Sequence, residues 1–484
     1  MAMEVVWTRA FTPVLETTIY AFAALLATYL FATWVGSCIY RRHLREGQVW
    51  TTPQLLAGLA VFSFLPIVLN DPRLWSSPLV VLLSIIPICA ALGYLTPKLI
   101  DQYSDGSPRT AGWGYALNVL GCIIGPLLAG YGLLPSLGVR FSMVLLATPF
   151  LLFNALDWLS NWKVKHAALG VLSVVMLLIS VFVSITYEDG ALHPHEVVRR
   201  DYTATVISYG EGMDKRLLVN GIGITSLGLT TKLMAHLPLA FHGARPQSAL
   251  VICFGMGTTF RSLMSWDIDV TAVELVPSVK EAFGYYFEDA PTLLRNPKGR
   301  IIIDDGRRFL NRTEQKFDVI TIDPPPPFAA AGSSLLYSRE FYEVVKRHLT
   351  TNGILQQWFP GGSDESLYAV ATSLTKAFPH VKAVAFDGIY FLAATHPFKT
   401  PSADVMIARM PMAARADFME WHHQYDLKEV IADVLSQITT YDPARQQYFN
   451  PAHPEYNDNL ISDDRPFNEY FFLRRLRERL AGTF

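Results

Sequence analysis

Three acidic residues, each closing a short apolar run, are the residues of this chain best suited to chemistry. Glu274 closes residues 270–273, Asp305 follows the run at 300–303, and Asp323 closes residues 317–322. A carboxylate at a strand end can accept hydrogen bonds from ribose hydroxyls or take a proton from an amine. Because parallel strands end at the same edge of a sheet, the spacing predicts that the three carboxylates converge.

A glycine turn accompanies these acids. The apolar run 249–254 leads into Gly255, Met256 and Gly257, a helix-like segment follows, and Glu274 lies nineteen residues after Gly255. A strand, a glycine turn, a helix and a strand ending in an acid are typical of the first unit of a nucleotide-binding α/β sheet. A purely structural glycine turn in an unrelated parallel sheet is the alternative, and it stays open.

Further apolar runs supply the elements that must position these residues. A helix over residues 342–349 and a strand over 353–358 follow Asp323, and runs at 381–386 and 389–393 predict an antiparallel pair at the sheet's edge. Strands that alternate with helices indicate a doubly wound, Rossmann-type α/β sheet, with ligands outside the carboxyl ends of its strands. Two β-like runs, 203–209 and 216–219, predict a small β-rich subdomain in front of it.

The first 187 residues differ in composition from the rest. The chain of 484 residues is 51% hydrophobic and 17% charged, and its apolar residues gather before residue 188. The net charge of −2 and the lack of a basic run argue against a nucleic-acid partner. The four cysteines lie in apolar stretches without metal-type spacing, which predicts small buried side chains rather than disulfides or metal ligands.

Six apolar stretches in this region approach or reach the roughly 20 residues that a membrane-spanning helix needs. They cover residues 18–39, 55–69, 79–95, 112–134, 141–159 and 167–187. A soluble all-helical domain is the alternative. Because ionisable residues are scarce within the stretches, an anchor is favoured over a transporter. We therefore expect a multi-pass transmembrane helical domain over 1–187, a linker over 188–201, the β-rich subdomain over 202–240 and the catalytic domain over 241–484.

The two sides of this expected membrane domain carry unequal charge. The loops after stretches one, three and five carry seven basic residues, Arg41, Arg42, Arg45, Lys98, Arg109, Lys163 and Lys165. The other side, which leads into the soluble half, carries only Arg9, Arg73 and Arg140. The positive-inside rule places the larger set in the cytoplasm and, with six crossings, the soluble half outside. A nucleotide-type cofactor argues for the cytoplasm instead. We therefore expect the helical domain in the cell membrane and the catalytic domain in the cytoplasm.

Several segments between residues 202 and 395 occur in a characteristic order. They read LLVNGIGITS, KLMAHLPL, the glycine turn, DDGRRFL, DVITID, SLLYSREFYEVVKRHL and GILQQW. This order resembles the spermidine synthase family, and more closely the bacterial membrane-fused spermidine synthase-like proteins. The resemblance implies a methyltransferase-like sheet and a polyamine aminopropyltransferase, which passes the aminopropyl group of decarboxylated S-adenosylmethionine to an amine.

The resemblance also implies roles for the candidate site residues. The turn at residues 255–257 would approach the cofactor, Glu274 would hold its ribose hydroxyls, and Asp305 with Gly306 would meet its adenine. Asp323 would orient the attacking amine and accept its proton. Because the sulfonium is already an activated leaving group, the reaction needs alignment and electrostatics but no metal.

Two positions depart from the family pattern. Met256 and Pro326 stand where soluble members carry aspartates that bind ammonium groups, and each charge-assisted hydrogen bond lost costs about 1.5–3 kcal/mol. Other side chains could compensate, the tyrosines through cation–π contacts. The candidate substrate-binding residues are Tyr337, Asp364, Glu365 and Tyr390. Surface exposure or core packing is the alternative for all four.

Two other functions stay open. Asp323-Pro324-Pro325 resembles the start of amino-methyltransferase loops, which suggests S-adenosylmethionine-dependent N-methylation of a small amine. A non-catalytic nucleoside-sensing or transport-associated membrane protein is the second alternative. The expected partners are a polyamine or other small amine and the lipid bilayer, and a homo-oligomer is compatible with the sequence.

Overall fold

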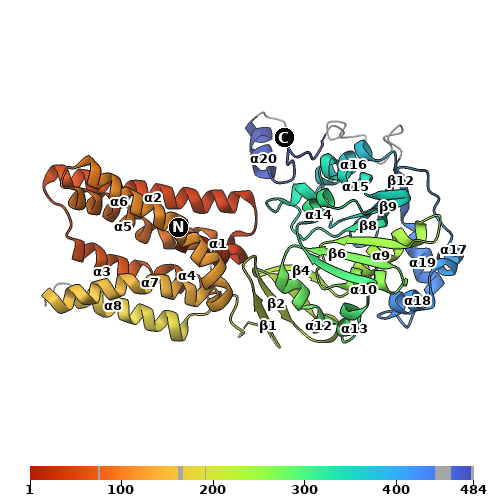
Figure 1. Cartoon of the computed structure of the whole chain (residues 1–484), viewed down its shortest axis with the longest axis horizontal. Helices are drawn as coiled ribbons and strands as arrows, with labels where there is room; N and C mark the ends of the chain where they lie inside the picture. Colours follow the sequence, from red (N-terminus) through yellow and green to blue (C-terminus); the bar gives the residue numbers. More distant parts are fainter. Residues whose placement is uncertain (75–76, 162–166, 191, 194, 442–458, 481–484) are drawn as a thin grey trace. The chain divides into compact units, whose positions relative to one another are not determined.

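The computed structural model describes residues 1–74, 77–161, 167–190, 192–193, 195–441 and 459–480. The chain forms two compact units: Met1–Ile207 with Val219–Ile222, and Ser208–Leu218 with Gly223–Phe484 (Figure 1). The first unit is mainly helical, and the second is built on a large sheet. The division between the units falls later in the chain than residue 187, where the expected helical domain ends.

The first unit is a set of apolar helices. Side-chain oxygens of Thr18, Thr51 and Ser77 cap the N-termini of α2, α3 and α5. The helices are α1 Ala2–Leu15, α2 Ile19–Glu46, α3 Thr52–Phe62, α4 Leu65–Leu69, α5 Pro78–Ser104, α6 Pro108–Leu127, η1 Leu128–Leu133, α7 Leu134–Asn161, α8 Ala167–Leu178 and η3 Ile179–Val183. The sequence did not predict α1, because Glu4 and Arg9 interrupt its apolar pattern.

In the part of the chain that the structure describes, four helices are long and apolar enough to cross a membrane. They are Ile19–Glu46, Thr52–Leu69, Pro78–Ser104 and Pro108–Leu156. The fourth contains two of the six predicted stretches, which meet at a break in the helix at Gly138, where φ is 71°. The sixth stretch forms a shorter apolar helix, Ala168–Val183. Lys163 and Lys165 lie outside the described residues.

Helices α2 and α5 approach each other through glycines. A Cβ atom added to Gly36 would lie 2.0 Å from the carbonyl oxygen of Ala90, and one added to Gly93 would lie 2.2 Å from that of Thr33. Only glycine lets two helix backbones come this close, as small residues do in membrane bundles.

The segment after the last apolar helix is bonded to the helices. Glu188 accepts a hydrogen bond of 2.9 Å from the backbone N–H of Val139, which begins the helix after the break, and forms an ion pair of 2.9 Å with Arg200. Arg200 ends strand β1 (Val197–Arg200). The expected linker over 188–201 is therefore in part a strand and in part tied to the bundle. Its charges suggested a solvated segment because their pairing is not visible in the sequence.

Two sheets organise the rest of the chain. The small sheet has the order β1-β2-β3-β4, and the large sheet has the order β12-β10-β11-β9-β8-β5-β6-β7. The remaining strands are β2 Thr205–Tyr209, β3 Arg216–Val219, β4 Ile222–Ser226, β5 Ser248–Ile252, β6 Asp269–Glu274, β7 Gly299–Ile303, β8 Phe317–Ile322, β9 Leu349–Phe359, β10 His380–Ala385, β11 Ile389–Ala394 and β12 Ile438–Tyr441. Strands β5 to β9 pair in parallel, which confirms the predicted doubly wound core.

The predicted antiparallel pair is present as β10 and β11, but it is not the edge of the sheet. Strand β12 pairs with β10 and forms the edge. Strand β12 was missed because it follows a helix-rich region and has only four residues. Strand β4 was missed because Gly223 interrupts its apolar pattern.

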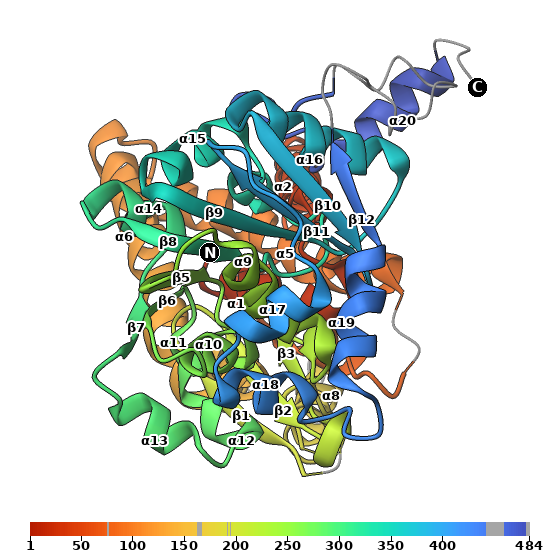
Figure 2. The same ribbon diagram turned by 90° about the vertical axis from the view of Figure 1, so that its right-hand side faces the viewer.

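Helices cover both faces of the large sheet. Figure 2 shows α14, α15 and α16 on one face and α9, α10 and α17 on the other. The helices are α9 Leu229–Phe241, α10 Thr258–Met264, α11 Pro277–Glu281, α12 Phe283–Tyr286, α13 Ala290–Arg295, α14 Gly306–Arg312, α15 Arg339–Arg347, α16 Asp364–Ala377, α17 Ala403–Arg409, α18 Met412–Met419, α19 Leu427–Ser436 and α20 Phe471–Leu480.

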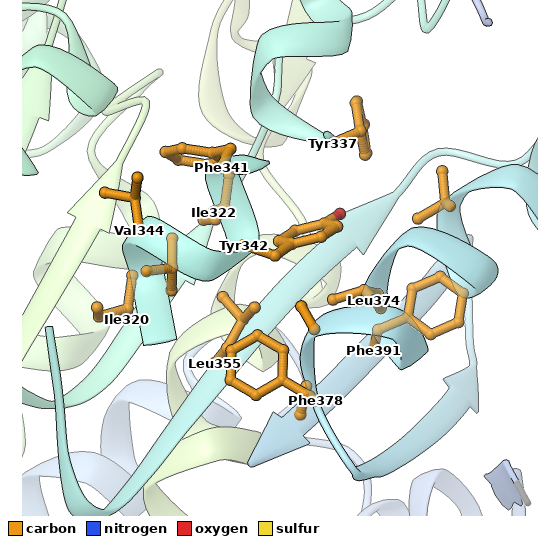
Figure 3. Close-up of a cluster of buried hydrophobic side chains, with 14 of the residues drawn as sticks. Ile320, Ile322, Tyr337, Phe341, Tyr342, Val344, Leu355, Leu374, Phe378 and Phe391 are labelled. Atoms are coloured by element: carbon orange, nitrogen blue, oxygen red, sulfur yellow. The ribbon is translucent and has the colours of Figure 1, made fainter. Parts of the chain in front are cut away.

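The main core lies between the sheet and helices α14 to α16. Ile320, Ile322 and Leu355 of β8 and β9 pack against Phe341 and Tyr342 of α15 (Figure 3). All of these side chains are buried, so the strand ends that carry the acids are held on a rigid platform.

A group of ionised side chains, which we call the ion cluster, joins α18 to α9 and α10. The fully buried Lys232 of α9 forms ion pairs with Asp417 (3.2 Å) and Glu420 (2.6 Å). Arg261 of α10 pairs with the same two carboxylates at 3.0 and 2.7 Å. His236 contacts Asp417 at 2.9 Å. The cluster fixes the C-terminal helices against the helix that follows the glycine turn.

Candidate active site

The three acids lie at one edge of the large sheet. Ile252 of β5 is in register with Val273 of β6 and with Ile322 of β8, so the next residues, Cys253, Glu274 and Asp323, occupy one row. Asp305 follows the neighbouring strand β7, whose last residue pairs with Glu274. The structure thus brings the three carboxylates together, as the spacing predicts.

The thiol of Cys253 lies within the electrostatic influence of all three acids. Burial raises the pKa of its thiol well above the ordinary value, and the charges of Glu274, Asp323 and Asp305 raise it further. The three carboxylates therefore act on the same side chain. The thiol stays protonated and is a poor nucleophile, so the chemistry of this edge belongs to the acids.

The glycine turn requires glycine at both of its ends. Gly255 and Gly257 have φ values of 54° and 87°, which other residues rarely adopt. A Cβ atom on Gly257 would also lie 2.5 Å from the ring of Phe283. Met256 between them is buried. At Gly306 an added Cβ atom would lie 2.4 Å from Ile252, so glycine there lets α14 begin close to strand β5.

Glu274 braces the turn and keeps the capacity to bind a ligand. One of its carboxylate oxygens accepts the N–H of Phe254 and the other that of Val276, both at 2.9 Å. Burial raises the pKa of Glu274, although these backbone donors oppose the shift. The backbone N–H groups of Gly255 and Leu275 also act on this carboxylate. Because a carboxylate oxygen can accept more than one hydrogen bond, the residue can accept a ribose hydroxyl as well.

Asp305 begins helix α14. Its side chain accepts the N–H of Arg308 at 2.7 Å, as an N-cap does. The neighbouring Asp304 carries the ion pair with Arg308. The carboxylate of Asp305 acts electrostatically on Arg307, and it remains partly exposed at the edge.

Asp323 has a pKa shifted toward neutrality. It retains partial contact with solvent, yet the protein around it raises its pKa to about 7, first through burial and then through the charge of Glu274. A carboxyl group with a pKa near neutrality can exchange a proton with a substrate at physiological pH. Such a shift, with a like charge at a sheet edge, is typical of a reactive site.

Two of the four candidate substrate-binding residues lie near Asp323. Burial raises the pKa of Tyr337 and of Tyr390, and in both cases Asp323 contributes to the shift. Both tyrosines are buried, and the hydroxyl of Tyr390 donates to the carbonyl of Thr230 at 3.1 Å. Both rings are almost fully enclosed, and Tyr337 also lies close enough to Cys253 for the two groups to interact.

The other two candidates are placed differently. Asp364 is exposed in the first turn of α16. Glu365 forms an ion pair of 3.0 Å with Arg474 of α20, so its charge is matched within the protein. Sequence could not show this pairing, because the partners lie 109 residues apart.

Two further residues at the edge were not singled out from the sequence. Trp358 of β9 follows Gln357, the register partner of Ile322, and itself pairs with Tyr390, so it stands between the strands of Asp323 and Tyr390. Its indole N–H is buried without a partner among the described residues. The hydroxyl of Thr258, directly after the glycine turn, is also buried without a hydrogen-bond partner among the described residues. The position of Trp358 at a strand end was the signal that could have identified it.

The described part of the chain contains no group of three or more His, Cys, Asp or Glu side chains suited to a metal ion.

Comparisons with known proteins agree with this arrangement. Residues 229–386 match the family model described as "Spermine/spermidine synthase domain". The polyamine aminopropyltransferase of Sulfurisphaera tokodaii is 30% identical over 161 residues, which is 32% of this chain and 54% of the relative. That of Thermococcus kodakarensis is 29% identical over 204 residues, 40% of this chain and 68% of the relative. The chain thus spans about half to two thirds of the length of these relatives.

A solved structure is also similar. The spermidine synthase of Thermotoga maritima aligns with 44% of this chain and 84% of its own, at 20% identity and a TM-score of 0.36. The matched domain begins at α9 and ends just after β10, and it includes the glycine turn and all three acids. Through this domain the chain is similar to spermidine synthases over about a third of its length.

Proposed function

We propose that the second unit is an aminopropyltransferase that moves the aminopropyl group of decarboxylated S-adenosylmethionine to an amine, with Asp323 as the general base. The observation that carries the proposal is the raised pKa of Asp323, about 7, in a row with the carboxylate of Glu274. The curated relatives are named polyamine aminopropyltransferases, which supports the same reaction class.

The proposed step is a single displacement. The amine nitrogen attacks the propyl carbon bound to sulfur, the carbon–sulfur bond breaks, and its electron pair stays on the neutral thioether. The carboxylate of Asp323 takes the proton that the attacking nitrogen must lose. Glu274 and the glycine turn hold the nucleoside so that nitrogen, carbon and sulfur align.

The acceptor side is aromatic rather than acidic. Tyr337 and Tyr390 lie in the electrostatic field of Asp323, and their rings suit an alkylammonium. Met256 is buried in the glycine turn, so the turn offers no carboxylate to the amino group of the propyl arm. We expect this departure to weaken binding of the decarboxylated cosubstrate relative to soluble enzymes.

We further propose that the helices of the first unit anchor the protein in the cell membrane. Four helices have the required length and composition, and large apolar side chains such as Phe31, Trp34 and Phe182 are exposed. We place the second unit in the cytoplasm, where its cosubstrate would be supplied. Ready labelling of an engineered cysteine in that unit by an impermeant reagent on intact cells would contradict this placement.

The reaction is tested with the full chain in detergent. Decarboxylated S-adenosylmethionine and a panel of amines are incubated with the protein, and products are identified by mass spectrometry. We expect a mass gain of one aminopropyl group. In a parallel calorimetric titration, tight binding of intact S-adenosylmethionine with no binding of the decarboxylated form would overturn the proposal in favour of N-methyl transfer.

A further inference from the structure

A C-terminal segment outside the matched domain holds the loop that follows Asp323. We call residues 461–474 the strap. Asn468 of the strap donates to the carbonyl of Phe328 at 2.6 Å and to the hydroxyl of Ser333 at 2.7 Å. Glu469 accepts both the backbone N–H and the hydroxyl of Ser334, at 3.1 and 2.5 Å. Asn468 is 2% exposed and Glu469 is 6% exposed, so water competes little for these bonds.

The strap has its own anchorage at both ends. The backbone N–H of Ile461 donates to the hydroxyl of Ser373 at 2.9 Å, and its carbonyl accepts the N–H of Arg339 at 3.0 Å. At the other end Arg474 forms its ion pair with Glu365, and its guanidinium lies 3.6 Å from the ring centroid of Phe467. The strap is therefore fixed independently of the loop and can hold the loop in one conformation.

The loop carries aromatic side chains to Asp323. The ring of Phe328 meets the ring of Tyr337 edge-on, with centroids 5.0 Å apart, and meets Phe359 in the same way at 5.1 Å. Tyr337 belongs to the buried core and lies within the field of Asp323 (Figure 3). The hydrogen bonds from the strap thus fix the backbone that places these rings on the acceptor side.

The nucleoside side is held mainly by other contacts, although Asp463 of the strap forms an ion pair of 2.5 Å with Arg307, next to Gly306. Glu274 is held by backbone N–H groups of residues 254 and 276, and the glycine turn leads into α10, which the ion cluster fixes. In the described part of the chain, the side-chain hydrogen bonds of Asn468 and Glu469 go to residues 328–334. The two halves of the site can therefore be perturbed separately.

We propose that Asn468 and Glu469 are positioning residues for the acceptor half of the site, which set the affinity for the amine and leave that for the nucleoside unchanged. The proposal rests on the proposed function for its kinetic part. It assigns a role to the strap, which lies more than 70 residues beyond the matched domain.

Glu469 offers a matched pair of variants. Glu469→Gln keeps an acceptor oxygen for Ser334, whereas Glu469→Ala removes it. Loss of two buried hydrogen bonds should raise the KM for the amine roughly 10-fold in Glu469→Ala. The dissociation constant of the nucleoside should stay within about two-fold, and Glu469→Gln should restore most of the amine affinity. Asp464→Ala, at an exposed position of the strap, is the control.

Hydrogen exchange of the peptide covering residues 324–338 gives a readout that does not depend on activity. We expect faster exchange in Glu469→Ala than in wild type, Glu469→Gln or Asp464→Ala. The proposal is overturned if Glu469→Ala folds and leaves both loop exchange and amine KM unchanged, or if it weakens nucleoside and amine alike. If wild type transfers no aminopropyl group but the exchange pattern is as expected, the function fails and the strap's hold on the loop stands.

Discussion

Asp323 and Asp417, two partly buried aspartates of the second unit, show how neighbours decide what a carboxylate does. Asp417 pairs with Lys232 and Arg261 in the ion cluster. Burial alone would raise its pKa, but hydrogen bonds from His236 and Ser262 and the charge of Lys232 hold the pKa well below the ordinary value. Asp323 has no cation beside it in the described structure, and its pKa rises to about 7.

The ion cluster also fixes the protonation of His236. The indole of Trp266, which can only donate, donates to Nδ1 of His236 at 2.9 Å. The proton of the imidazole therefore sits on Nε2 and is donated to Asp417. Every group of the cluster is satisfied, which suits a structural role. The unmatched charge at Asp323 is instead costly to the fold and useful to a reaction.

The largest effect should come from Asp323→Asn. Loss of the base should lower kcat by about 10²–10⁴-fold, while nucleoside affinity stays near wild type. The folded pKa of Asp323 lies above its unfolded value, so its contribution to stability is present below about pH 4 and lost as pH rises through 7. At pH 8 the variant should therefore melt at the same or a higher temperature. Undiminished turnover would refute the assignment of the base.

Asp417→Asn should lower stability and leave activity almost unchanged. It leaves Lys232 and Arg261 without their shared partner, and breaking a buried ion pair costs about 3–5 kcal/mol. The folded pKa of Asp417 lies below its unfolded value, so its stabilising contribution is present above about pH 4 and lost as pH falls further. Denaturation midpoints at pH 7 check the loss, and activity per folded molecule should change little. A variant that is stable but inactive would contradict this assignment, because Asp417 would then contribute to the reaction rather than to folding.

Glu274→Gln should act on both binding and the base. An amide has one acceptor oxygen for the two backbone donors that Glu274 now accepts, so nucleoside affinity should fall about 10–100-fold. Because the charge of Glu274 raises the pKa of Asp323, the acidic limb of kcat/KM should move to lower pH. Calorimetry and a pH profile measure the two effects. If the acidic limb of kcat/KM stays at the same pH, burial alone raises the pKa of Asp323.

The smallest effect should come from Arg261→Lys. Arginine reaches Asp289, Asp417 and Glu420 at once, and a lysine ammonium cannot reproduce this planar geometry. We expect a loss of about 1–2 kcal/mol in the free energy of unfolding, with kcat unchanged. A loss of activity larger than the loss of stability would mean that the ion cluster also tunes the site.

The acids at the edge of the sheet could be predicted because the pattern that marks them lies in short, continuous stretches of sequence. Each acid closes an apolar run, and the parallel arrangement of β5 to β8 then places Glu274, Asp305 and Asp323 together whatever the details of packing. The helical nature of the first unit followed in the same way from composition.

Contacts between distant residues could not be predicted. The partners of Lys232, Asp417 and Glu420, lie 185 and 188 residues away from it in the sequence. The pairing of Glu365 with Arg474, and of Glu469 with Ser334, likewise depends on where the C-terminal segment lies. Such pairs carry no periodicity or spacing, so only a structure reveals them.

The pH dependence of kcat/KM for wild-type protein, measured from pH 5 to 9 with saturating nucleoside, tests the central claim most directly. A carboxylate base with a pKa of about 7 predicts an acidic limb centred there, absent from the residual activity of Asp323→Asn. A flat profile down to pH 5 would contradict the account, because the group that accepts the proton would then be an ordinary, solvated acid.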